Sequence, residues 1–247
     1  MSKQKKTTII TGATSGIGQA TANLFGERGH DLILIGRDAE RMGAISSKLR
    51  EKGVSVRFFL LDFAVDGAVE SFFRDHGVEL GPVDNLVNSA GTAKLSTIGD
   101  ISETDCDLLF RVNVTGAIMM TKYALPNLLQ TPYPSVVNVS SVAGRQKSLS
   151  LGVHYTASKA ALIGVTRHLG TELVSEGVRV NAITPSQTHS PMLDYALTSD
   201  AQKELASRNP MGRLGKPEEQ AEVIWFLCSE AASYINGAII DVNGGIL

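Results

Sequence analysis

The feature that most constrains the fold of this 247-residue chain is a repeated alternation of short apolar runs with longer stretches of helical period. Several of the apolar runs are rich in Val and Ile and are apolar continuously, which is typical of strands covered on both faces of a sheet. Strands are therefore predicted at 7–10, 31–35, 55–61, 85–88, 135–139, 179–183 and 238–242. Helices are predicted at 16–29, 37–52, 64–76, 103–129, 155–176 and 217–229.

Strand–helix alternation of this kind implies right-handed crossovers between parallel strands. We therefore expect an α/β fold, a single doubly wound Rossmann-like domain over residues 1–247 with a parallel sheet of about seven strands. The segment 186–213 interrupts the alternation, because it is polar and carries Pro191 and Pro210 around a possible short helix. It is interpreted as a lid over a ligand crevice, the alternative being a surface loop without a role.

Composition excludes several classes of function. Lys plus Arg is 23 and Asp plus Glu is 25, so no global basic field favours nucleic acid as a partner. Cys106 and Cys228 stand in no metal-like spacing, so we expect no metal and a thiol-reducing compartment. Residues 1–12 contain no apolar signal-peptide core, and no apolar run approaches the ~18 residues of a membrane span. A cytoplasmic protein without a membrane partner is expected.

A glycine-rich loop, residues 11–18, follows the first predicted strand and opens the first predicted helix. Gly12, Gly16 and Gly18 permit close approach of a ligand, and backbone N–H groups at a helix start can receive a pyrophosphate. The alternative is a strand–helix turn that is packed tightly for structural reasons.

The end of the second predicted strand suggests which nucleotide is bound. Gly36 and Arg37 occupy the place where an acidic residue would bind a ribose 2′-hydroxyl, and an arginine there can hold a 2′-phosphate. Arg37 therefore favours NADP(H) over NAD(H), unless it is simply a solvated arginine that begins a helix. Asp62, which ends the third predicted strand, contacts the adenine or caps a helix.

Tyr155 and Lys159 carry the chemistry that the sequence suggests. They stand four residues apart and so share one helix face, where a cation favours the phenolate and lowers the phenol pKa. Ser140 and Ser141 lie just upstream, at the carboxyl end of the fifth predicted strand, where open α/β sheets bind ligands.

With these motifs in order, the sequence resembles the short-chain dehydrogenases/reductases over nearly its whole length. The resemblance rests on the glycine loop, Asp62, the run 88–91 (Asn-Ser-Ala-Gly), Asn113, Ser141, Tyr155, Lys159, the run 181–185, and the run 241–245 (Asp-Val-Asn-Gly-Gly).

The resemblance implies catalytic roles for four residues. Tyr155 would be the general acid for carbonyl reduction and the general base for alcohol oxidation, and Ser141, rather than Ser140, would polarise the substrate oxygen. Lys159 would lower the tyrosine pKa and bind the nicotinamide ribose, and Asn113 would support a water that relays protons. Without the resemblance, Asn113 would simply bond the backbone.

The resemblance also assigns a set of cofactor contacts. Ser186 stands where the family usually has glycine, Thr188 is more polar than the usual residue, and Ser15 replaces a basic residue common in NADP-preferring relatives. The predicted cofactor-binding residues are Gly12, Thr14, Ser15, Gly16, Ile17, Gly18, Arg37, Asp62, Phe63, Asn88, Ala90, Gly91, Tyr155, Lys159, Pro185, Thr188 and Ser190.

The substrate is less constrained. Arg145, Leu149, Gln187 and His189 are predicted to face it. One hypothesis is that Arg145, Lys147 or His189 binds an anionic group, the alternative being solvated loop charges. Residues 130–133 and Glu176 lack the basic patch with which relatives dock acyl carrier protein, which favours a free small molecule.

The resulting prediction is an NADP-dependent oxidoreductase that moves a hydride between nicotinamide and a ketone or secondary alcohol. The alternatives are an enzyme similar to 3-oxoacyl-acyl-carrier-protein reductases and a non-catalytic nucleotide-binding regulator on the same fold. The resemblance further implies a homotetramer, or a homodimer, assembled through residues 103–129, 155–176 and 238–247.

Overall fold

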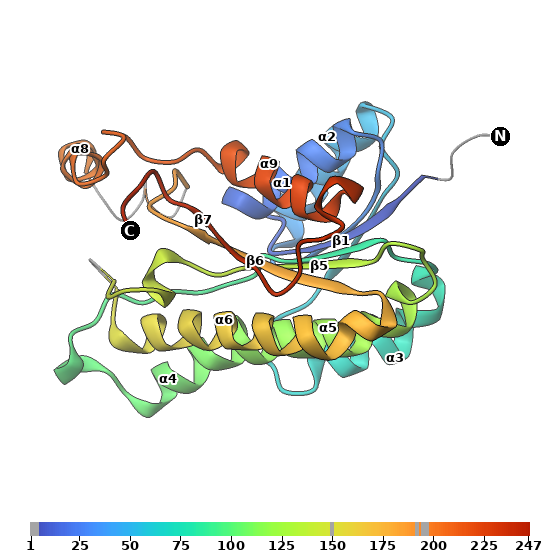
Figure 1. Ribbon diagram of the computed structural model, residues 1–247, viewed down its shortest axis with the longest axis horizontal. Coiled ribbons are helices and arrows are strands. Elements are labelled where there is room, and N and C mark those ends of the chain that lie inside the picture. The colour runs from blue at the N-terminus through green and yellow to red at the C-terminus, as the bar shows by residue number, and fades with distance from the viewer. Residues whose placement is uncertain (1–4, 149–150, 191–192, 194–197) are drawn as a thin grey trace.

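A parallel β-sheet forms the centre of the molecule in the computed structural model, which describes residues 5–148, 151–190, 193 and 198–247 (Figure 1). Within these residues seven strands are hydrogen-bonded in the order β3-β2-β1-β4-β5-β6-β7, and every pairing is parallel. This confirms the predicted doubly wound α/β fold. The strands are β1 (Thr7–Thr11), β2 (Asp31–Gly36), β3 (Val56–Leu60), β4 (Asn85–Asn88), β5 (Ser135–Val139), β6 (Arg179–Pro185) and β7 (Ile239–Val242).

Continuous apolar strands supply two cores, one on each face of the sheet. In β1, Ile9 packs on one face and Ile10 on the other, and in β2 the same division separates Ile33 from Leu32. All four side chains are at most 1% exposed. Burial on both faces is therefore the reason that these strands read as unbroken apolar runs rather than alternating ones.

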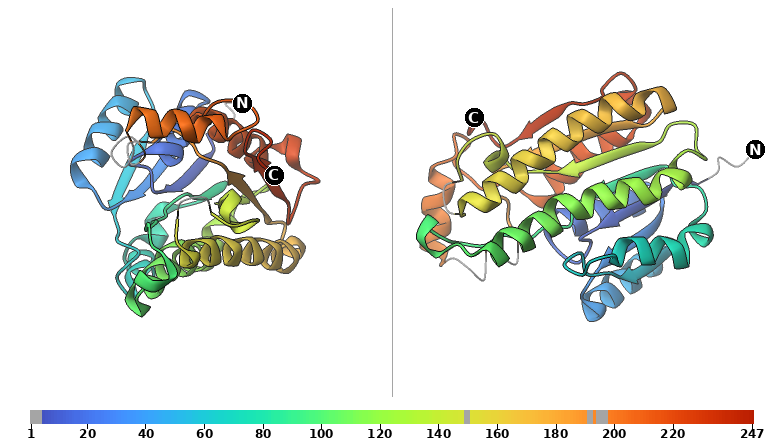
Figure 2. Two further views of the ribbon diagram at one scale, coloured as in Figure 1. Left: turned by 90° about the vertical axis from the view of Figure 1, so that its left-hand side faces the viewer. Right: turned by 90° about the horizontal axis from the view of Figure 1, so that it is seen from below.

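Helices cover both faces of the sheet (Figures 1 and 2). One layer contains α1 (Gly16–Glu27), α2 (Ala39–Glu51) and α9 (Pro217–Cys228), and the opposite layer contains α3 (Ala68–Leu80), α4 (Glu103–Phe110), α5 (Gly116–Leu128) and α6 (Val153–Leu173). The right-hand view of Figure 2 shows the helices of the second layer side by side in front of the sheet. The described part of the chain contains no helix long and apolar enough to cross a membrane.

Two helix predictions differ from the structure. The helix predicted at 64–76 is α3, which begins four residues later because Gly67 adopts a left-handed conformation at its start and Asp62 accepts a hydrogen bond from the Ala64 amide. The helix predicted at 103–129 is divided into α4, a π-helical turn (Arg111–Thr115) and α5. A π turn inserts an extra residue into a helix and is frequent at functional sites.

The segment after β6 leaves the sheet at the same end as the carboxyl termini of the strands (Figure 1). It contains the short helix α8 (Ser199–Ser207) and returns through residues 209–216, here called the strap, to the start of α9. Thr188 and Gly215 form an isolated parallel bridge between the two ends of this excursion.

The sheet order creates a crevice at its centre. Strands β2 and β3 lie on one side of β1, whereas β4 to β7 lie on the other, so the loops after β1 and β4 leave in opposite directions. Open α/β sheets bind ligands at such a switch point, outside the carboxyl ends of the strands.

Candidate active site

A cleft of about 830 Å³ lies at this switch point. Its walls come from the ends of β1, β2, β3, β4, β5 and β6 and from the start of α6. Among the residues predicted from the sequence, those that line it are Gly12, Thr14, Ser15, Gly16, Ile17, Arg37, Asp62, Phe63, Ala90, Gly91, Ser141, Tyr155, Lys159, Pro185, Thr188, His189 and Ser190.

Five predicted site residues lie outside the lining of this cleft, namely Gly18, Asn88, Asn113, Arg145 and Gln187. Leu149 lies outside the described residues. Asn88 and Gly18 have structural contacts instead of a place in the cleft. The Asn88 amide donates to the Asn138 side chain at 2.9 Å within the sheet, and a Cβ at Gly18 would lie 2.3 Å from the Gly12 carbonyl oxygen. Both residues therefore shape the floor beneath the cleft.

The loop after β1 packs directly against the loop after β4. A Cβ at Gly12, whose φ is +67°, would lie 2.8 Å from the Ala90 backbone, so only glycine fits there. The Thr11 hydroxyl accepts hydrogen bonds from the Ser89 and Ala90 amides at 3.1 and 3.0 Å. This role of Thr11 was not predicted, because it depends on a contact between two distant segments.

The start of α1 is suited to a phosphate group. Ser15 precedes the helix without a side-chain capping bond, whereas Asp38, Ser102 and Thr198 cap the starts of α2, α4 and α8. Gly16 lines the cleft with φ +52° and presents no side chain toward it. The N–H groups of a helix start carry a partial positive charge, so an anion is stabilised there. The residues present therefore fit a dinucleotide pyrophosphate.

Ser140 and Ser141 have different environments at the end of β5. The Ser140 hydroxyl is buried and donates to the Lys159 carbonyl oxygen at 2.9 Å. The Ser141 side chain accepts from the Ala143 amide at 3.1 Å and is hydrogen-bonded to Tyr155 in the cleft. Ser140 thus ties β5 to α6, and Ser141 is the serine placed beside the phenol.

Tyr155 and Lys159 line the cleft together from one face of α6. The Lys159 Nζ atom lies 5.9 Å from the Tyr155 ring centroid and donates to the Val139 carbonyl oxygen at 2.9 Å. Burial raises the pKa of the Tyr155 phenol, an effect that the hydrogen bond from Ser141 opposes. The predicted lowering of this pKa is therefore not found in the described structure, and the phenol is protonated at neutral pH.

Lys159 is itself desolvated. The residue is only 5% exposed, and this burial lowers the pKa of its ammonium group from 10.5 to about 8. Burial destabilises the charged form of the side chain, so the ammonium group gives up its proton more readily than an exposed lysine does. The geometry therefore places a proton donor, Tyr155, beside a titratable amine.

Asn113 lies in the π turn and is hydrogen-bonded both to the loop after β4 and to α6. Its Oδ1 atom accepts from the Thr92 amide at 2.8 Å, and its Nδ2 atom donates to the Thr92 carbonyl and the Ser158 hydroxyl, both at 3.0 Å. A Cβ at Gly91 would lie 3.4 Å from Asn113 Oδ1 and 3.5 Å from Lys159 Nζ. Asn113 thus joins the loop after β4 to α6 next to the lysine.

The short 3₁₀ turn that follows Ser141 (Val142–Gly144), here called the Ser141 turn, ends in Gly144, which controls how closely the turn approaches α6. A Cβ at this position would lie 2.7 Å from the carbonyl group of Lys159. Gly144→Ala is expected to lower the free energy of unfolding by about 1–3 kcal/mol, as measured by denaturant unfolding. Gly164→Ala is the control, since a Cβ there meets no atom within 4 Å and alanine favours helix α6. Equal stability of the two variants would contradict this account.

The far side of the cleft carries two arginines. Arg37 and Arg41, which precede and begin α2, both line it, and Arg41 also forms an ion pair with Asp38 at 3.3 Å. Arg41, which was missed in the sequence, stands four residues after Arg37 in the first turn of α2. Because β1 and β4 separate β2 from β5, the arginines lie about 14 Å from the Ser141 end at ordinary strand spacing.

The predicted substrate residues are divided by the structure. Arg145 forms an ion pair with Asp241 at 3.2 Å, so its guanidinium group connects the Ser141 turn to β7 and does not line the cleft. The Gln187 carbonyl accepts from the Gly215 amide at 2.9 Å, which places its backbone against the strap. His189 lines the cleft and is exposed. No group of three or more potential metal ligands occurs among the described residues.

Comparisons with known proteins agree with this arrangement. Residues 12–247 match the family model described as enoyl-(acyl carrier protein) reductase. The chain is 34% identical to the 3-oxoacyl-acyl-carrier-protein reductase of Aquifex aeolicus over 98% of each protein. It is also 34% identical to the cis-4-hydroxycyclohexanecarboxylate dehydrogenase of Sinomonas cyclohexanicum, over 98% of this chain and 96% of that one. L-sorbose reductase from Gluconobacter frateurii, solved with NADPH and L-sorbose, superimposes with a TM-score of 0.91 at 29% identity over 98% and 97% of the chains.

Proposed function

The chain belongs to the short-chain dehydrogenase/reductase family of oxidoreductases, and from this premise we propose that it is an NADP(H)-dependent reductase of a free small-molecule ketone. The proposal rests chiefly on one observation: a single cleft has Arg37 and Arg41 at one end and Ser141, Tyr155 and Lys159 at the other. The starts of α1 and α2, with the loop after β4, would hold the dinucleotide between them. The bound nicotinamide supplies or accepts the hydride.

The protein supplies the proton and the orientation. A phenol whose pKa is raised is protonated at neutral pH, so Tyr155 is ready to donate to a carbonyl oxygen as it gains charge. The Ser141 hydroxyl, which is bonded to Tyr155, would hold that oxygen in place. In the reverse direction Tyr155 would first have to lose its own proton to solvent, and the phenolate, stabilised by the Lys159 ammonium, would then accept the alcohol proton.

The adenosine end supports NADP(H). Arg37 is exposed and Arg41 is only partly engaged by Asp38, so both guanidinium groups are available to a 2′-phosphate. The second cation that is absent at Ser15 is thus replaced by one at Arg41. The solved relative from Gluconobacter frateurii was complexed with NADPH, which is consistent with this proposal.

A titration of NADPH and NADH in parallel, followed by nicotinamide fluorescence, tests the cofactor preference. Arg37→Ala is expected to weaken NADPH binding about 10- to 100-fold, because a charge-assisted hydrogen bond contributes about 1.5–3 kcal/mol, and to leave NADH binding unchanged. Lys48→Ala, in the following helix α2 but outside the cleft lining, is the control. Tighter NADH binding by the native protein would reverse the preference, and binding of neither nucleotide would favour the non-catalytic regulator.

A carrier-bound substrate is the second candidate. It is favoured by the relative from Aquifex aeolicus, which is named a 3-oxoacyl-acyl-carrier-protein reductase. Two observations favour a free substrate instead. Residues 130–133 and Glu176 offer no basic patch for a carrier protein, and the relatives named for sorbose and for hydroxycyclohexanecarboxylate are named for free small molecules. Reduction rates with a β-ketoacyl thioester of acyl carrier protein and with a free β-ketoester, measured side by side, distinguish a carrier-bound from a free substrate.

We further infer that residues 1–247 form a single nucleotide-binding domain in which the segment of about 186–213 is the lid. Exposed apolar side chains at the end of α4 and the start of α6, such as Phe110 and Val153, support assembly into a homotetramer or homodimer. The expected compartment is the cytoplasm. Light scattering at micromolar concentration tests the assembly, and a monomer would refute it.

A further inference from the structure

The cleft wall beyond β6 is held by one residue of the strap. Thr188 pairs with Gly215, the His189 amide donates to the Gly215 carbonyl at 2.9 Å, and the Gly215 amide donates to the Gln187 carbonyl at 2.9 Å. Thr188 and His189 line the cleft. The position of Gly215 therefore sets the position of this part of the wall.

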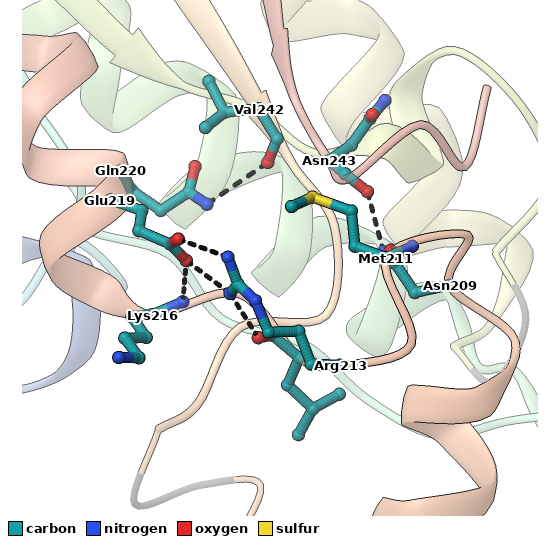
Figure 3. Close-up of polar contacts among 9 residues, drawn as sticks. Asn209, Met211, Arg213, Lys216, Glu219, Gln220, Val242 and Asn243 are labelled. Carbon is teal, nitrogen blue, oxygen red and sulfur yellow. Dashed lines mark hydrogen bonds and ion pairs between the residues drawn. The ribbon is translucent and has the colours of Figure 1, made fainter.

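Arg213 and Glu219 are hydrogen-bonded to each other, and Figure 3 shows this pair together with the bond from the Lys216 amide to Glu219. The Arg213 guanidinium donates to the two Glu219 carboxylate oxygens at 2.6 and 2.9 Å, and also to the Leu214 carbonyl at 3.1 Å. Glu219 in turn accepts from the Lys216 amide at 2.8 Å. One carboxylate thus fixes residues before and after Gly215, an arrangement called here the Arg213–Glu219 clasp.

The clasp is anchored to a rigid element. Glu219 lies in the first turn of α9, and its neighbour Gln220 is 1% exposed and donates to the Val242 carbonyl at 3.2 Å. The other end of the strap is fixed by the buried Asn209, which donates to the Asn243 carbonyl at 2.8 Å. A Cβ at Gly215 would lie 3.3 Å from both Gln220 Nε2 and Thr188 Oγ1, so the strap and the wall are in close contact.

Global stability does not account for the clasp. The Arg213 and Glu219 side chains are 43% and 40% exposed, and ion pairs as exposed as this contribute little to the free energy of unfolding. Neither residue lines the cleft. Its distinguishing feature is geometric, because a two-point contact between guanidinium and carboxylate fixes orientation as well as distance.

We propose that Arg213 and Glu219 are positioning residues for the nucleotide: through Gly215 they hold the Thr188–Ser190 wall against the nicotinamide half of the cofactor. The proposal rests on the proposed function, since it requires the dinucleotide to occupy this cleft. Because the wall lies at the end of β6 and not at the arginine end, the clasp acts on NADPH and NADH alike.

Arg213→Gln, Glu219→Gln and the double variant test the proposal in steady-state assays with both nucleotides. Each single variant is expected to raise KM for NADPH and for NADH by the same factor, about tenfold, with kcat at saturation within about twofold of the native value. The double variant should be no worse than the worse single variant, because both changes break one contact.

Glu222→Gln is the matched control. Glu222 lies about one turn further along α9 and forms an ion pair with Arg28, whose Nη2 atom lies 2.8 and 2.7 Å from its two carboxylate oxygens, away from the cleft lining. We expect unchanged KM values for this control and similar thermal midpoints for all variants. Unchanged KM in the clasp variants, an effect on NADPH alone, or an equal effect in Glu222→Gln would overturn the proposal while leaving the proposed function intact. A native protein that binds neither nucleotide would overturn both.

Discussion

Tyr155→Phe is expected to lower kcat/KM for carbonyl reduction by about 10²- to 10⁴-fold, the range that a positioned general acid contributes. The phenol is the group in the cleft that Ser141 contacts, and its raised pKa keeps its proton in place at neutral pH. Phenylalanine keeps the ring, so the packing of α6 is retained and only the proton donor is removed. NADPH affinity should therefore remain within about threefold of the native value.

The control for this prediction is Tyr133→Phe, which removes a hydroxyl from an exposed ring outside the cleft lining. Turnover and binding should both be unchanged in that variant. Comparable turnover in Tyr155→Phe would remove this residue as the acid and base, whereas parallel loss of NADPH binding would indicate a role in holding the nucleotide.

The strands, the glycine loop and the shared helix face of Tyr155 and Lys159 could be predicted because local sequence determines them. Val and Ile run continuously through strands that are buried on both faces, and Gly12 and Gly16 adopt the backbone conformations that a tight loop requires. Tyr155 and Lys159 are four residues apart on one helix, so their common face follows from the helical period.

Other features depend on contacts between distant segments, which the sequence pattern does not reveal. Arg145 reads as a free loop cation, but Asp241 in β7 neutralises it. Asn88 was predicted as a cofactor contact, and the structure places it outside the cleft lining, with its amide donating to Asn138 on the neighbouring strand. The pairing of Thr188 with Gly215 is likewise set by the return path of the strap. The start of α3 was misplaced because the left-handed turn at Gly67 competes with continuation of the helix.

Lys159→Met is the second substitution for which we expect a large effect. In the proposed mechanism, removing the ammonium eliminates a charge beside Tyr155 and a donor to the nucleotide, so kcat/KM should fall by about 10²- to 10³-fold and NADPH binding should weaken as well. The two readouts separate Lys159 from Tyr155, whose replacement is expected to affect the rate alone. An unchanged affinity would confine the lysine to the proton-transfer step.

The same substitution is expected to stabilise the protein without nucleotide at neutral pH. Burial lowers the Lys159 pKa from 10.5 to about 8, so at pH 7 the folded state carries an ammonium that costs about 3 kcal/mol. Methionine removes this cost but also loses the charge-assisted bond to the Val139 carbonyl, worth about 1.5–3 kcal/mol, which leaves a gain of about 1 kcal/mol. Between pH 8 and 10.5 the folded lysine holds fewer protons than the unfolded one, so native stability rises with pH and the advantage of the variant disappears. Denaturant unfolding of both proteins at pH 7 and 10 measures this difference, with Lys122→Met, at an exposed lysine, as the control. A difference in unfolding free energy that is the same at both pH values would show that burial does not destabilise the Lys159 ammonium.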